Sequence, residues 1–108
     1  MNYSVLTIPP FDKQLKKLVK KYPSLKSEIA TFITHLKTEP KQGTALGNDC
    51  YKIRLAISSK GKGKSGGARV ITYVAITDKE IYLLSIYDKS QQAIIEDKVL
   101  LRLLDLIR

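Results

Sequence analysis

The chain has one cysteine, one histidine, no tryptophan and only ten acidic residues. Cys50 cannot form an internal disulfide and suits a reducing compartment. Together with His35 it provides neither a metal-ligand set nor a Cys–His pair with usable spacing. The carboxylates are scattered, and Asp49, Asp78 and Asp88 are placed like turn residues. These absences argue against a metal-dependent nuclease and predict neither a metal site nor another cofactor.

Long apolar runs are also missing. No run approaches the ~20 residues that a membrane span needs, and the first residues, MNYSVLTIPPFDK, lack a basic region followed by an apolar one. We therefore expect a cytoplasmic protein without a membrane partner. The length of 108 residues and the hydrophobic fraction of 44% predict a single domain over residues 1–108 with one core.

Positive charge is abundant. Nineteen Lys and Arg residues outnumber ten Asp and Glu residues and give a net charge of +9 at pH 7. Such a surplus on a small domain attracts nucleic acid, an anionic membrane or an acidic protein. Because part of the charge lies in a glycine-rich loop and on strands, nucleic acid or an acidic protein is favoured over simple solvation of basic helices.

The N-terminal half predicts a strand and two helices. Residues 2–8 are rich in β-branched and aromatic side chains. Apolar residues at helical spacing then run from Phe11 to Tyr22, and a second series follows Ser24, a favourable N-cap. Pro23 separates the two helices, which are predicted to form an antiparallel hairpin.

The C-terminal half predicts three strands and a helix. Lys41–Asp49 is predicted to be a loop, and from Cys50 the apolar period changes to two. The expected elements are strands over 50–57, 68–77 and 81–87 and a helix over 94–107. The order β-α-α-β-β-β-α predicts an α+β fold, with the N-terminal helical hairpin packed on one face of a mainly antiparallel four-stranded sheet and a C-terminal helix.

The loop SSKGKGKSGG before the second of these strands could bind phosphate. It is not a Walker A loop, because the glycine required five positions before GKS is Ser58 and a strand follows instead of a helix. Glycines and three lysines could form a mobile cationic finger that touches phosphates. A solvated hairpin loop explains the composition equally well. The lysines are Lys60, Lys62 and Lys64.

One face of the predicted sheet gathers cations. If the apolar residues that alternate along 51–55 pack under the helices, Lys52 and Arg54 point to the opposite surface. Arg69 and Tyr73 can join them from a paired strand, about 5 Å away across the strands. Such crowding costs repulsion that the fold does not require, which favours a site for an anion over ordinary surface charge.

Three segments resemble the RelE/ParE toxin superfamily of bacterial type II toxin–antitoxin systems, and its RelE/HigB-like members in particular. The segments are NDCYKIRL (residues 48–55), ARVITYVAI (68–76) and IYLLSIYDKS (81–90). The resemblance implies a toxin that inhibits translation as a ribosome-dependent mRNA endonuclease, or mRNA interferase. It also implies three partners: the ribosome, mRNA and a cognate antitoxin.

The resemblance implies roles for four basic residues. Lys52 would act as the base, Arg54 and Arg69 would hold the phosphate, and Lys89 would assist. RNA supplies its own nucleophile, the 2′-hydroxyl, and arginines can stabilise the developing charge without a metal. Lys60, Lys62 and Lys64 would then grip the RNA backbone.

The proton donor is a departure from the family pattern. RelE-type enzymes commonly have a tyrosine in the C-terminal segment, where this chain has Ile95. Tyr73 or Tyr87 could replace it. Two alternatives stay open: a ParE-type inhibitor that binds DNA gyrase, and an inactive relative that only binds nucleic acid.

Overall fold

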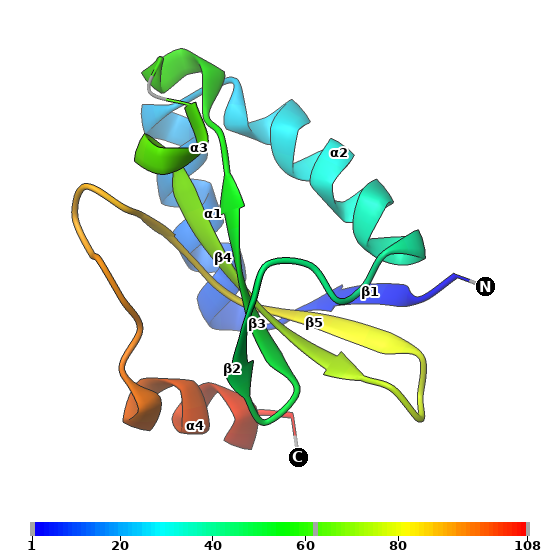
Figure 1. Ribbon diagram of the computed structural model, residues 1–108. Coiled ribbons are helices and arrows are strands. Elements are labelled where there is room, and N and C mark those ends of the chain that lie inside the picture. Colours follow the sequence, from blue (N-terminus) through cyan, green and yellow to red (C-terminus); the bar gives the residue numbers. More distant parts are fainter. Residues whose placement is uncertain (1, 62, 108) are drawn as a thin grey trace.

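In the computed structural model, which describes residues 2–61 and 63–107, five strands form one sheet in the order β1-β5-β4-β3-β2 (Figure 1). The strands are β1 (Ser4–Thr7), β2 (Thr44–Gly47), β3 (Cys50–Leu55), β4 (Ala68–Ala75) and β5 (Glu80–Asp88). The helices are α1 (Pro9–Lys21), α2 (Leu25–Thr38), α3 (Gly63–Gly66) and α4 (Asp97–Asp105), and η1 (Ser58–Lys60) is a 3₁₀ turn. Only β1 pairs in parallel, with β5. The predicted α+β class and mainly antiparallel sheet are confirmed. The sheet has five strands among the described residues, where four were predicted.

The predicted helical hairpin is present. In α2, Leu25, Ile29, Phe32 and Leu36 are buried and follow the helical period. Ser24 is the N-cap residue of α2, as predicted, but its side chain makes no capping hydrogen bond to the helix backbone. Its hydroxyl instead donates to Glu28 Oε1 at 3.0 Å and accepts from the backbone N–H of Ser59 at 2.9 Å.

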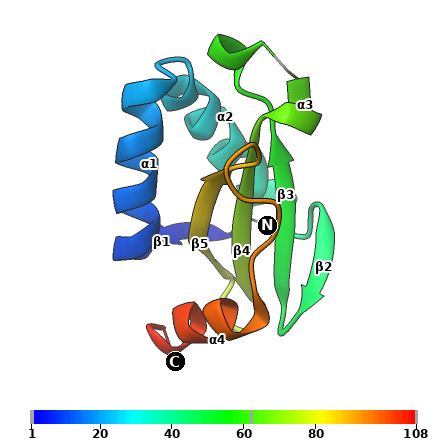
Figure 2. The ribbon, with the colours of Figure 1, turned by 90° about the vertical axis from the view of Figure 1, so that its left-hand side faces the viewer.

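Apolar side chains cover both faces of the sheet. Ile53 and Val70 are direct cross-strand partners and join the core with the buried residues of α1 and α2. Cys50 and Ile71 point to the other face and are buried as well. The helix α4, whose Leu100 and Leu104 are buried, lies at the end of the sheet away from α3 (Figure 2). The helix α4 therefore does not cover the end of this face near α3, where polar residues lie.

The expectation of a loop over residues 41–49 is wrong in part, because this segment contains β2. Thr44 pairs with Lys52 and Gly47 with Cys50. The turn between β2 and β3 consists of Asn48 and Asp49, both at positive φ (55° and 60°). Two successive residues in the left-handed region suit a two-residue hairpin, and Asn and Asp tolerate it.

The C-terminal helix is shorter than predicted. It begins at Asp97, and Ile94, which was placed in it, is 63% exposed. Ile95 packs against the core. None of the helices in the described ranges combines the length and the apolar character needed to cross a bilayer.

Candidate active site

The basic residues of β3 and β4 lie on one face of the sheet. Lys52 and Arg54 are two residues apart in β3 and therefore point the same way. Arg54 is the direct cross-strand partner of Arg69, which places their Cβ atoms about 5 Å apart. Lys52 pairs with Ile71, one step further along the same face. The structure thus brings together three of the predicted site residues.

This row of side chains continues onto β5, where Tyr87 is the cross-strand partner of Arg69. We call Arg54, Arg69 and Tyr87 the arginine–tyrosine row. Accessibility falls along it: Arg54 is exposed, whereas Arg69 is 4% and Tyr87 6% exposed. Arg69 Nη1 donates to the carbonyl of Ala68 at 3.2 Å. Arg54 is therefore accessible to solvent, whereas its cross-strand neighbour Arg69 is buried.

The hydroxyl of Tyr87 is buried and has no hydrogen-bond partner among the described residues. Burial raises the pKa of Tyr87, and the positive charge of Arg69 opposes this only in part. The phenol is therefore protonated at neutral pH and is able to donate a proton beside Arg69.

Tyr73, the other candidate, lies further away. It shares the face but is four residues from Arg69 along β4, or about 13 Å. It pairs with Tyr82, and the two rings are stacked with centroids 6.1 Å apart. Of the two tyrosines, the structure brings only Tyr87 next to Arg69.

Lys89 lies at the same end of the sheet. It follows β5 directly, is exposed, and donates its backbone N–H to the carbonyl of Gly67 at 3.1 Å. Gly67 approaches β3 so closely that a Cβ there would lie 2.1 Å from the Leu55 carbonyl oxygen. The backbone around Lys89 and the start of β4 is thus tightly packed.

The expectation of a mobile finger is wrong for the first part of the loop. Ser58 donates its backbone N–H to Glu28 Oε2 at 2.8 Å, and Ser24 donates its backbone N–H to Ser59 Oγ at 3.0 Å. Burial raises the pKa of Glu28, but hydrogen bonds from Ser58 and Ser24 lower it by more, so the carboxylate is ionised. These bonds attach η1 to α2.

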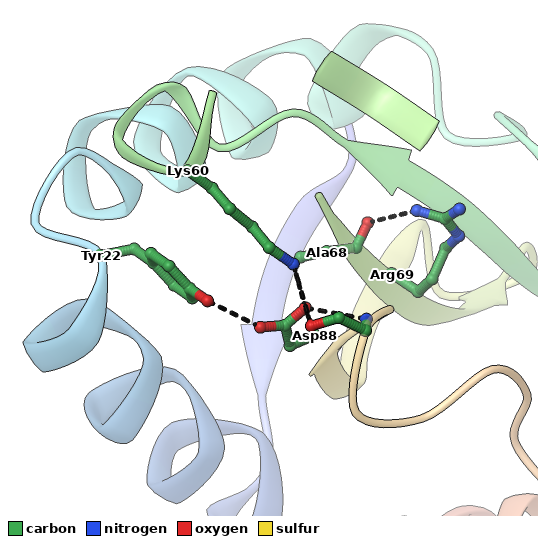
Figure 3. A network of polar contacts seen from close by, with 6 residues as sticks. Tyr22, Lys60, Ala68, Arg69 and Asp88 are labelled. Carbon is green, nitrogen blue, oxygen red and sulfur yellow. Dashed lines mark hydrogen bonds and ion pairs between the residues drawn. The ribbon is translucent and has the colours of Figure 1, made fainter. Parts of the chain in front are cut away.

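Lys60 does not reach toward solvent as predicted. Its side chain is 9% exposed and its Nζ forms an ion pair with Asp88, whose side chain is 0% exposed (Figure 3). Lys62 lies outside the described residues, and only the backbone of Lys64 is described, within α3. Asp88, expected as a turn residue, ends β5 and is buried. Sequence reasoning missed this pair because nothing local distinguishes Asp88 from other strand-terminal aspartates.

The other expectations concern residues outside the group of basic side chains. Cys50 is buried and forms no disulfide with the described chain. His35 is exposed on α2. Within residues 2–61 and 63–107, no group of three His, Cys, Asp or Glu side chains could hold a metal. A cavity of about 340 Å³ borders Tyr87 between α1 and residues 91–92, and Gln14 lines it.

Residues 11–105 match the family described as the RelE toxin of the RelE/RelB toxin–antitoxin system. This match covers the helical hairpin, the sheet strands from β2 onward and α4.

Several solved structures have a similar fold. The chain aligns along its whole length with the whole of a doubly substituted E. coli toxin RelE in the free state, at 18% identity and a TM-score of 0.67. A chain of the intact E. coli RelBE toxin–antitoxin complex matches 80% of this chain over 95% of its own length, at 18% identity and a TM-score of 0.60. A metal-bound toxin from Helicobacter pylori matches 85% of this chain over 99% of its own length, at 21% identity and a TM-score of 0.54.

Proposed function

The chain belongs to the RelE toxin family, and on this premise we propose that it is an endoribonuclease that cuts mRNA on the ribosome. The proposal is carried by one observation, the direct pairing of Arg54 and Arg69 on the face that also bears Lys52. Two adjacent guanidinium groups match a phosphodiester in charge and geometry.

The chemistry uses the RNA as its own nucleophile. The 2′-oxygen attacks the adjacent phosphorus while Lys52 accepts the 2′-hydroxyl proton. The bond between phosphorus and the 5′-oxygen breaks, giving a 2′,3′-cyclic phosphate and a 5′-hydroxyl. Arg54 and Arg69 stabilise the charge on the non-bridging oxygens, and Lys89 assists from the end of β5. The phosphate contacts Arg54 first, and access to Arg69 requires the side chains around it to rearrange.

Tyr87 gives its proton to the departing 5′-oxygen. It is adjacent to Arg69 in the sheet, whereas Tyr73 lies two rows away. Ile95, at the position of the family's C-terminal tyrosine, packs against the core and has no proton to give. The raised pKa of Tyr87 keeps the hydroxyl protonated until the leaving oxygen develops its charge.

The partners follow from the charge. A net charge of +9 suits the ribosome and mRNA, and Lys62 and Lys64 would contact the RNA backbone. A cognate antitoxin would neutralise the toxin by laying an acidic segment across the basic face. The whole of residues 1–108 would act as one RelE-like domain in the cytoplasm, where ribosomes are found.

A translation extract with a defined mRNA tests this function. The wild type should produce ribosome-dependent cuts, and Lys52→Ala and Arg69→Ala should each slow them by about 10²–10³-fold. Lys98→Ala is the matched control, because Lys98 is an exposed lysine of α4, away from the basic face. Unchanged cleavage by Arg69→Ala, or no cleavage by the wild type, would contradict the proposal.

The burial of Arg69 counts against phosphate binding by that residue, and a second candidate, a ParE-type inhibitor of DNA gyrase without nuclease activity, does not need such binding. A guanidinium that stays buried contributes to packing and does not hold a phosphate. Inhibition of gyrase supercoiling together with intact mRNA would select this candidate, whereas salt-dependent RNA binding with neither effect would indicate an inactive relative.

A further inference from the structure

A buried ion pair joins the glycine-rich loop to the end of β5. The Asp88 carboxylate receives Lys60 Nζ on Oδ1 and the Tyr22 hydroxyl on Oδ2, the latter at 2.9 Å (Figure 3). Asp88 Oδ1 also accepts the backbone N–H of Ser90 at 3.0 Å and its hydroxyl at 2.8 Å. We call Tyr22, Lys60, Asp88 and Ser90 the Asp88 cluster.

Both charges of the pair are well satisfied. Lys60 Nζ also donates to Ser90 Oγ at 3.2 Å. It lies 5.7 Å from the centre of the Tyr22 ring, in a cation–π contact. Burial raises the pKa of Asp88, but the hydrogen bonds from Lys60, Ser90 and Tyr22 lower it by more, to well below its ordinary value. The carboxylate is therefore charged, and the pair is a true ion pair at neutral pH.

Holding the loop does not require this pair. Ser58 and Ser59 already attach η1 to Glu28 and Ser24. A buried ion pair also adds little net stability compared with apolar residues of the same size, because desolvation offsets most of the attraction. The ion pair therefore has a role other than attaching the loop to α2.

The cluster lies where two proposed site residues begin. Asp88 is the cross-strand partner of Ala68, the residue before Arg69, and the Ala68 carbonyl accepts the Arg69 guanidinium. Lys89 follows Asp88 and is tied through its backbone N–H to Gly67. Fixing Asp88 thus fixes the start of β4 and the point at which Lys89 leaves β5.

We propose that Lys60 and Asp88 are positioning residues that hold Lys89 and Arg69 in place for cleavage, and that Lys60 does not contact RNA. The inference rests on the proposed function and replaces the phosphate-gripping role expected for Lys60. The positive charge of Lys60 neutralises the Asp88 carboxylate, so the binding of RNA to this surface depends on the other lysines and arginines.

A double-mutant cycle of Lys60→Met, Asp88→Asn and the double variant tests the proposal. Each single variant leaves one buried charge uncompensated and should lower kcat at least tenfold, with KM within about twofold of wild type. The double variant removes both charges, and the introduced asparagine keeps an oxygen that can accept from Ser90 while its NH2 group can donate to the Tyr22 hydroxyl oxygen, so kcat should recover most of the loss. Lys98→Met, which removes a lysine from an exposed ion pair with Glu96, is the matched control and should behave as wild type.

RNA binding separates positioning from contact. If Lys60 only positions, the slope of log affinity against log salt stays that of wild type in Lys60→Met. A slope reduced by about one, with a raised KM and a double variant no better than the single, would make Lys60 a phosphate contact and overturn the proposal. Wild-type kcat in all three variants would overturn it too.

Amide hydrogen exchange provides a readout that does not depend on cleavage. Each single variant should speed exchange of the Lys89 N–H, which bonds Gly67, and the double variant should restore its protection. If the wild type cuts no RNA, the proposed function fails, and unchanged exchange at Lys89 would separately refute the positioning role. If Asp88→Asn does not fold, Lys60→Met and the double variant still decide the question.

Discussion

The substitution Tyr87→Phe should affect stability and activity in opposite directions. The Tyr87 hydroxyl is buried without a hydrogen-bond partner in the described chain, and leaving such a group unsatisfied costs about 1–3 kcal/mol. Removing it while keeping the ring should therefore leave the protein as stable or stabilise it by about 1 kcal/mol, which raises Tm by about 4–8 °C for a domain of this size. Loss of the proton donor should slow cleavage by about 10²–10⁴-fold.

Thermal unfolding and single-turnover cleavage, measured on the same preparation, check both effects. Tyr73→Phe is the control, because Tyr73 lies about 13 Å from Arg69 along β4. It should cleave like the wild type. A Tyr87→Phe variant that is less stable would show that the hydroxyl has a partner in solution, and a variant with full activity would remove Tyr87 from the mechanism.

Two further predictions concern stability. The pKa of Asp88 is lower in the folded protein than in the unfolded chain, so the stability that its carboxylate contributes is complete above the ordinary aspartate pKa, about 3.9, and is lost as the pH falls below it. Asp88→Asn should therefore be less stable than the wild type at pH 7. Its free energy of unfolding should also decrease less than that of the wild type when the pH is lowered. Gly67→Ala should cost about 1–3 kcal/mol in chemical denaturation, because its Cβ would meet the Leu55 carbonyl oxygen, whereas Gly61→Asn, at positive φ in open space, should cost much less.

The residues on the basic face of the sheet could be predicted because they follow from the alternation of side chains within single strands. The alternation along β3 fixes which side Lys52 and Arg54 share, and the run before β5 places Arg69 in a paired strand. The antiparallel pairing of β3 with β4 follows from their succession along the chain. β2 was missed although its turn carries a readable signal, because Asn48 and Asp49 are residues that tolerate positive φ in a two-residue hairpin turn.

The loop could not be predicted because its partners are distant in the sequence. Composition alone makes a stretch with glycines and lysines look mobile. Its order comes from Ser59 contacting Ser24, 35 residues away, and from Lys60 contacting Asp88, 28 residues away. Neither contact has a periodicity or a motif. The burial of Arg69 is equally invisible, since the alternation along β4 does not show which other segments cover its side chain.

The count of nineteen Lys and Arg residues therefore overstates the cations available to RNA. Near the candidate site, Arg54 and Lys89 are exposed, whereas Arg69 is nearly buried and Lys60 is neutralised by Asp88. Exposed cations release counterions on binding and set the salt dependence of affinity, whereas Arg69 reaches the phosphate only after rearrangement and Lys60 acts on geometry. Substituting Arg54 should weaken RNA binding, and disturbing Lys60 should slow the reaction of RNA that is already bound. A sequence gives all four residues the same charge, and it is the ion pair with Asp88 that distinguishes the positioning role of Lys60 from the RNA-binding role of the others.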